Sequence, residues 1–259
     1  MLLIAANTAG ARTLATRDLQ NGPYTCPQCS TDVVLKRGRK VTAHFAHTPG
    51  SACQAAGEST RHLLAKQVLA EEFTRLGYQA HIEVVHHAAG RRVDVVAART
   101  DEHGRQRRVA VEIQDSAIQV DTAKKRVVLD RRLGYDATVW LFTTYRAAAL
   151  FHAKPDAEVR VPNEMLWADH RYGHGVHLID PDGRAVWRAE LSEVYREGES
   201  REWYDEDGDP TGVDYPGYVP KTIRTVQLHQ AGFRLTSAPG LFGDAWSIVF
   251  AAEPEGSTS

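Results

Sequence analysis

The stretch VAVEIQDS, residues 109–116, decides which fold this sequence predicts. Its Val and Ile side chains alternate with a second face that carries Glu112 and Gln114, which is the two-residue period of a β-strand. Charged and amide side chains are seldom buried without partners. A strand that places Glu112 and Gln114 side by side on one face therefore indicates that these two side chains have specific partners or a function.

The segments around this strand predict a mixed α/β core. Residues 58–77, ESTRHLLAKQVLAEEFTRLG, have apolar side chains near helical spacing and end at a glycine. Three strand-like runs follow, AHIEVVHH (80–87), RRVDVVAAR (91–99) and RRVAVEIQD (107–115). A basic helix is expected over residues 117–133 and a buried strand, ATVWLFTT, over 137–144. The predicted order is helix, three strands, helix, strand.

The rest of the chain is expected to form two further regions. Short β elements and turns fill residues 1–56, and the α/β core takes residues 57–150. Turn signals such as DPDG, DEDGDP and SAPG dominate residues 151–259, with short aromatic strands between them. We therefore predict an N-terminal β-rich module, a central α/β domain and a β-rich C-terminal region without an assigned role.

The composition and the first residues of the chain indicate in which class of protein it belongs. In 259 residues, no apolar run approaches the roughly 20 residues of a membrane helix. The first residues, MLLIAANTAG, lack the basic start of a signal peptide. We expect a cytoplasmic protein with no membrane partner. The chain has three cysteines, an odd number that disfavours a disulfide framework and favours a metal site.

A zinc site is predicted in the N-terminal module. Cys26 and Cys29 form a CxxC pair, and AHFAHTPGSAC follows at residues 43–53. Thiolates and imidazoles are the ligands that Zn²⁺ prefers, and a structural site takes four. Cys53 and His47 are the expected third and fourth ligands, with His44 as the alternative to His47. The other reading is a small core with reduced cysteines and incidental histidines.

A second metal site is predicted at the strand of residues 109–116. Asp94 lies in the preceding strand, so a short turn can bring it beside Glu112 at one end of the sheet. Two carboxylates suit Mg²⁺ or Mn²⁺, which bind few protein carboxylates and keep several waters. Gln114 could hydrogen-bond a metal-bound water or a phosphate oxygen. The alternative is a surface lattice of ion pairs between these carboxylates and four nearby arginines, Arg91, Arg92, Arg107 and Arg108.

The formal net charge of −2 does not by itself indicate a nucleic-acid partner, but the charge is unevenly placed. Ten acids and two arginines lie between Glu190 and Asp214. Basic clusters elsewhere could form a DNA-binding face. The candidate contacts are Lys36, Arg37, Arg39, Lys40, Lys124, Lys125 and Arg126.

Together these motifs resemble the PD-(D/E)xK nuclease superfamily and, more closely, the CoiA-like competence proteins. The resemblance rests on CPQC, HFAH, ESTRHLLAK, VDVVA and VEIQDS, which occur in that order. It covers roughly residues 20–145 and leaves the last hundred residues without a counterpart. Each fragment alone is weak, whereas the ordered combination is specific.

The resemblance implies roles for individual residues. Asp94 and Glu112 would be metal ligands, and Glu58 a third carboxylate. Gln114 stands where most of the superfamily has a catalytic lysine. His62 and Lys66 follow Glu58 by one and two helical turns, so Lys66 could supply the positive charge that Gln114 lacks.

The function expected is a Mg²⁺- or Mn²⁺-dependent deoxyribonuclease that hydrolyses phosphodiester bonds, with a structural zinc module that assists DNA binding. One alternative is a non-catalytic factor that binds incoming, single-stranded DNA during uptake and recombination. Others are a defence-system nuclease component and a purely structural zinc protein. The sequence leaves open the strand preference, recombination or defence protein partners, and homo-oligomerisation.

Overall fold

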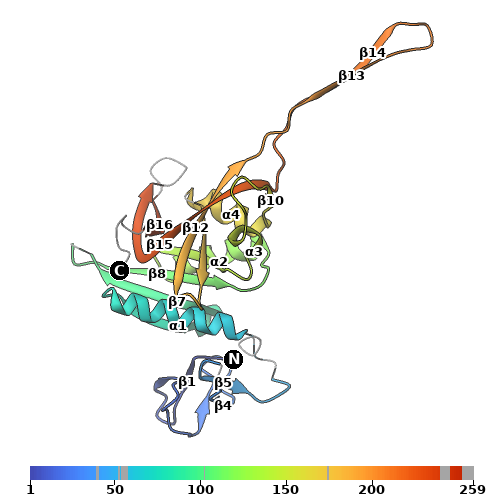
Figure 1. The fold of residues 1–259 in the computed structure, drawn as a ribbon. Coiled ribbons are helices and arrows are strands. Elements are labelled where there is room, and N and C mark those ends of the chain that lie inside the picture. The colour runs from blue at the N-terminus through green and yellow to red at the C-terminus, as the bar shows by residue number, and fades with distance from the viewer. Residues whose placement is uncertain are drawn as a thin grey trace.

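The computed structural model describes residues 1–38, 41–51, 53, 58–101, 103–173, 175–239 and 246–252. Two of the predicted DNA contacts, Arg39 and Lys40, lie outside these residues. Within them the strands form a small N-terminal sheet, a large central sheet and a two-stranded hairpin (Figure 1).

The N-terminal sheet has five strands in the described residues, in the order β2-β1-β3-β4-β5. Their bounds are β1 Ile4–Ala6, β2 Arg12–Leu14, β3 Tyr24–Thr25, β4 Asp32–Lys36 and β5 His44–His47. Its core is small, and the rings of Tyr24 and Phe45 lie 4.9 Å apart in it. A core of this size gains much from an additional cross-link.

Helix α1, Thr60–Arg75, begins where the sequence supplies a cap. The Ser59 hydroxyl accepts a hydrogen bond from the His62 amide, which satisfies one of the free N–H groups of the first turn. Ala65, Leu69 and Phe73 are fully buried along one side of the helix. Gly77 follows with a φ of 83°, a left-handed conformation that ends the helix at low cost.

The central sheet has nine strands in the described residues and mixes parallel with antiparallel pairs. The order is β10-β15-β12-β11-β9-β8-β7-β6, with β16 paired to β15. Strand β9 runs parallel to both β8 and β11, and the other pairs are antiparallel. The bounds are β6 Gln79–His86, β7 Arg91–Thr100, β8 Gln106–Gln114, β9 Ala137–Thr143, β10 Val159–Arg160, β11 Val176–Asp180, β12 Ala185–Glu193, β15 Ile223–Pro239 and β16 Trp246–Ala252.

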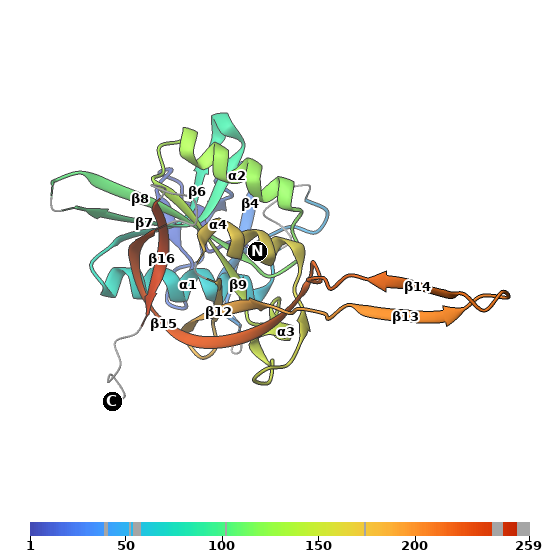
Figure 2. The same ribbon diagram turned by 90° about the horizontal axis from the view of Figure 1, so that it is seen from above.

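Helices cover both faces of this sheet. Buried side chains of α1 pack with Val111 and Val139 on one face. Helix α2, Val120–Arg132, and helix α4, Asn163–Tyr172, pack with Trp140 and Phe142 on the other (Figure 2). The element order α1, β6, β7, β8, α2, β9 is the order predicted from the sequence, and a mixed, strand-rich α/β fold is confirmed.

The C-terminal part differs from the turn-dominated region that was expected. Helix α4 lies in it, the short helix α3 (Ala148–Phe151) stands at its start, and its strands extend the central sheet through the β9–β11 pair. The acidic segment forms a hairpin of β13 (Glu199–Tyr204) and β14 (Pro210–Tyr215), which projects from the body (Figure 1). No helix of the described residues is long and apolar enough to cross a membrane.

Candidate active site and metal centre

The site forms where strands β7 and β8 separate. The backbone pairing of β7 with β8 runs from Thr100–Gln106 to Val95–Val111. Beyond that pair, side-chain carboxylates lie against the backbone amides of the two strands. The amide of Ile113 donates to Asp94 Oδ2 at 3.0 Å, and the amide of Asp94 lies 3.4 Å from Glu112 Oε1. The two carboxylates are thus held side by side at the point where the sheet opens.

A cavity of about 440 Å³ lies at this opening. Five of the six predicted catalytic residues line it, namely Glu58, His62, Asp94, Glu112 and Gln114. The sixth, Lys66, is fully buried beneath it. Arg91, Arg92 and Arg126 also line the cavity, so its wall is rich in groups that can contact a phosphate.

Glu112 is almost fully buried, with 1% of its surface exposed, which is less than expected for a carboxylate at the rim of a site. Its Oε1 lies 2.8 Å from Arg91 Nη2, and its Oε2 lies 3.0 Å from Arg126 Nη1. Burial and the nearby Asp94 raise the pKa of Glu112, against the effect of the two arginines. Of the four arginines in the predicted ion-pair alternative, Arg91 does pair with Glu112, but this pair is buried and not part of a surface lattice.

Asp94 is held by groups from α1. His62 Nε2 lies 3.2 Å from its Oδ2, and Lys66 Nζ lies 3.6 Å from its Oδ1. Although burial opposes ionisation, these two cationic groups and the Ile113 amide hold the pKa of Asp94 well below its usual range. Burial likewise opposes protonation of His62, but Asp94 outweighs it and raises the imidazole pKa.

Lys66 lies at the centre of three carboxylates. Its Nζ is 2.5 Å from Glu58 Oε2 and 2.9 Å from Glu83 Oε1, in addition to the contact with Asp94. Burial opposes the charge of Lys66, but Glu83, Asp94 and Glu58 together raise its pKa. Arg92 pairs with the second oxygen of Glu58. Lys66 therefore faces the carboxylates from inside the protein rather than from the cavity.

Two residues of this network were missed by the sequence analysis. Glu83 sits opposite Asp94 on β6, with a left-handed φ of 54°, and nothing in AHIEVVHH marks it. Asp115 lines the cavity and accepts from Ser59 at 2.5 Å and from Thr143 at 2.7 Å. Asp115 follows Gln114 directly in the motif, so its position was a usable signal.

The carboxylates could hold a divalent cation through two protein ligands. Asp94 and Glu112 offer hard oxygen atoms at the wall of a cavity with room for the waters that Mg²⁺ keeps. Glu58 is turned toward Lys66 and Arg92. Apart from one cysteine–histidine group, the described residues contain no cluster of three or more His, Cys, Asp or Glu side chains arranged to hold a metal ion.

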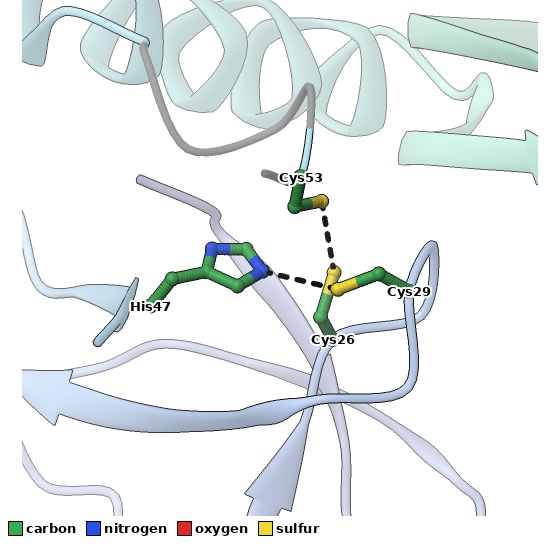
Figure 3. A group of neighbouring side chains, drawn as sticks. All are labelled: Cys26, Cys29, His47 and Cys53. Carbon is green, nitrogen blue, oxygen red and sulfur yellow. Dashed lines mark hydrogen bonds between the residues drawn. The ribbon is translucent and has the colours of Figure 1, made fainter. Parts of the chain in front are cut away.

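That group is the predicted zinc set. The ligand atoms of Cys26, Cys29, His47 and Cys53 all lie within 4.8 Å of one another (Figure 3). The sulfurs of Cys26 and Cys53 are 3.9 Å apart, and Cys29 Sγ is 3.4 Å from His47 Nε2. The structure leaves the alternative ligand His44 outside the group, where its Nδ1 lies 2.9 Å from the Thr42 carbonyl.

These distances fit a tetrahedral zinc ion. Zn–S bonds of about 2.3 Å and Zn–N bonds of about 2.0 Å place two sulfurs ~3.8 Å apart and sulfur and nitrogen ~3.5 Å apart. Burial raises the pKa of the Cys26 thiol to about 12, so this sulfur stays protonated at neutral pH until a cation displaces its proton. The Cys₃His set could therefore bind zinc.

The predicted DNA contacts fall in two places. Lys36 and Arg37 are exposed at the end of β4, where Arg37 hydrogen-bonds Asn21. Lys124 and Lys125 are exposed on α2, and Arg126 points from the same helix to Glu112. The predicted DNA contacts that the structure describes thus lie on the N-terminal module and on α2, whose Arg126 lines the cavity.

Comparison with known proteins agrees with these features. The family described as "Competence protein CoiA, N-terminal domain" matches residues 8–56, and "Competence protein CoiA, nuclease-like domain" matches residues 58–153. No curated protein and no solved structure matches the chain. The first match contains the Cys₃His group, and the second contains every lining residue of the cavity between β7 and β8 except Gln28. The two matches cover more than half of the chain, which therefore belongs to the CoiA family of competence proteins, with a nuclease-like domain.

Proposed function

We propose that this protein is a metal-dependent nuclease that hydrolyses DNA phosphodiester bonds at the cavity between β7 and β8. The observation that carries the proposal is the pair Asp94 and Glu112, held side by side on separating strands at the wall of a cavity lined with arginines. The match to the nuclease-like domain spans this site. The helix–strand order around it supports a core of the PD-(D/E)xK kind.

In this proposal Asp94 and Glu112 hold one Mg²⁺ or Mn²⁺ ion. A bound divalent ion lowers the pKa of a coordinated water and neutralises charge that develops on the phosphate. The buried network behind Asp94 fixes the orientation of its carboxylate, because His62 and Lys66 each contact one of its oxygens. Preorganisation of this kind lowers the cost of reaching the transition state.

Gln114 takes the role of a positioning residue. Its side chain is 8% exposed and lines the cavity two residues beyond Glu112. An amide carries no charge, so Gln114 can orient the attacking water or a phosphate oxygen but cannot neutralise the leaving group. The arginines of the wall, Arg92 and Arg126, are the charged groups that can face a phosphate there.

The zinc module would hold DNA against the cavity. Gln28, which lies between Cys26 and Cys29, lines the cavity together with residues of β7 and β8. A zinc ion at the Cys₃His group would fix the loop that carries Gln28. Lys36 and Arg37 on the module and Lys124 and Lys125 on α2 would contact backbone phosphates, which gives affinity without sequence preference.

A second candidate function is a non-catalytic DNA-binding factor in uptake and recombination. The observation in its favour is that the carboxylates are already paired: Glu112 with two arginines, and Glu58 with Lys66 and Arg92. A carboxylate neutralised in this way can serve stability alone. Such a factor would bind DNA and pass it to protein partners without cleaving it.

Plasmid nicking separates the two candidates. Zinc-loaded protein is dialysed into buffer without divalent cations, and supercoiled plasmid is then added with and without Mn²⁺. The proposal predicts nicked plasmid with Mn²⁺ and intact plasmid without it, for the wild type but not for Glu112→Gln. Tight DNA binding with no nicking under Mn²⁺ or Mg²⁺ would favour the accessory factor instead.

A further inference from the structure

The two arginines that pair with Glu112 are held very differently. Arg91 donates through Nε and Nη2 to the two oxygens of Asp130 at 2.9 and 3.0 Å, and Asp130 has no exposed surface. Thr138 donates to the same carboxylate at 3.0 Å. Arg91 is therefore fixed between Glu112 and Asp130, with 6% of its side chain exposed.

Arg126 has one charged partner in the described part of the chain. Its Nη1 lies 3.0 Å from Glu112 Oε2, and 39% of its side chain is exposed. It belongs to α2, where Lys124 and Lys125 come just before it and are exposed. The guanidinium therefore lies between a buried carboxylate and the predicted path of the DNA backbone.

We propose that Arg126 exchanges Glu112 for a DNA phosphate and thereby couples DNA binding to divalent-cation binding at Glu112. This inference rests on the function proposed above. Without DNA, Arg126 pairs with Oε2 of Glu112, the oxygen that neither Arg91 nor the Asp94 amide contacts, and its charge repels a metal ion. When DNA binds, a backbone phosphate pairs with the guanidinium of Arg126, and Glu112 becomes available to the metal ion. The protein would then load its metal only where substrate is present.

Two physical requirements support the exchange. A cation can bind Glu112 only if a positive group leaves, and Arg126 can leave because its removal exposes no other buried charge. Guanidinium pairs as readily with a phosphate as with a carboxylate, in both cases through two parallel hydrogen bonds. Because binding free energies are reciprocal, the metal must also tighten DNA binding by the same factor.

The experiment measures Mn²⁺ affinity from the electron paramagnetic resonance signal of the free ion. Zinc-loaded protein is titrated with Mn²⁺ alone and with a saturating phosphorothioate DNA oligonucleotide, which resists hydrolysis. For the wild type, DNA should tighten Mn²⁺ binding about 5-fold or more, the lower end of typical coupling. Arg126→Ala should bind Mn²⁺ without DNA more tightly than the wild type, and DNA should then add little.

The matched control is Lys125→Ala, its neighbour on α2. This variant should need more DNA to reach saturation, but the ratio of Mn²⁺ affinities with and without DNA should stay at the wild-type value. Arg126→Gln serves as a second variant that keeps most of the side-chain volume. Melting temperatures close to that of the wild type would show that both variants at position 126 are folded.

The outcomes separate this inference from the function on which it rests. Mn²⁺ that binds the wild type equally well with and without DNA, and that is lost in Glu112→Gln, would overturn the coupling but keep the metal site. Full coupling in Arg126→Ala would overturn the role of Arg126. Absence of any Mn²⁺ binding besides the zinc site would overturn both the coupling and the nuclease proposal.

Discussion

Lys66 and Glu83 form an ion pair in which Nζ lies 2.9 Å from Oε1, and neither side chain is more than 2% exposed. Lys66 comes from α1 and Glu83 from β6. The Glu83 carboxylate also accepts hydrogen bonds from the amides of Leu3 and Ile4, at 3.3 and 3.2 Å. One buried pair therefore joins the helix, the sheet and the first strand of the N-terminal module.

This pair makes Lys66 a determinant of stability. Lys66→Met keeps most of the length of the side chain but leaves Glu83, Glu58 and Asp94 without their shared cation. Removal of one partner of a buried ion pair typically costs about 3–5 kcal/mol. We expect a loss of this size in the free energy of unfolding measured with urea. Lys125→Met, at an exposed position, should change it by less than about 0.5 kcal/mol. Equal stabilities of the two variants would contradict this role.

The pH dependence of stability should report the same pair. Burial opposes ionisation of Glu83, but Lys66 and Arg92 outweigh it and hold its pKa below the usual 4.5. A carboxyl whose pKa is lower in the folded state stabilises the fold above the pKa of the unfolded chain, and this contribution is lost as the pH falls. The stability difference between wild type and Glu83→Gln should therefore be largest near pH 7 and shrink below about pH 4.5. A difference that stays constant from pH 7 to pH 3 would contradict the assignment.

The zinc site can be tested by metal content. Protein purified without chelator should contain about one zinc ion per chain. Cys29→Ser should lose most of that zinc and melt at a lower temperature, because the small core of the module depends on the cross-link. His44→Ala is the matched control, because His44 lies on the same strand as His47 but outside the group. Zinc lost from His44→Ala and kept in His47→Ala would reverse the ligand assignment.

DNA binding by α2 should show in its salt dependence. The logarithm of the affinity falls with the logarithm of salt concentration in proportion to the number of phosphates contacted. The double variant Lys124→Ala/Lys125→Ala should lower this slope by about 1.4–1.8, as expected for two lost contacts. Arg201→Ala, on the acidic hairpin, should leave the slope unchanged. A slope that is the same in all three proteins would place DNA on another surface.

Local sequence signals predicted much of this fold. Gly77 was predicted to end α1, and the alternation in VAVEIQDS places Val109, Val111 and Ile113 in the core under α1. These signals are short-range, because caps and two-residue periods depend on neighbouring residues. The zinc group was also visible in the sequence, since thiols and imidazoles at this spacing have few other uses.

Long-range features could not be predicted in the same way. No local signal shows that β11, Val176–Asp180, pairs in parallel with β9 and so joins the C-terminal strands to the central sheet. Glu83 looks like an ordinary polar strand residue until Lys66 and the amides of β1 surround it. The pairing of Glu112 with Arg126 likewise depends on how α2 packs on the sheet, which side-chain periodicity does not fix.

Whether Asp94 and Glu112 together hold one catalytic metal ion is tested most directly by the rate of Mn²⁺-dependent plasmid nicking in four proteins: wild type, Asp94→Asn, Glu112→Gln and the double variant. The amides keep the shape of the carboxylates, and so avoid the larger cavity that alanine would leave at Glu112. If both carboxylates hold one metal ion, each single variant should lose nearly all activity, and the double variant should be no worse, because residues that act as a unit are not additive. Nicking at the wild-type rate in folded Asp94→Asn and Glu112→Gln would contradict the account.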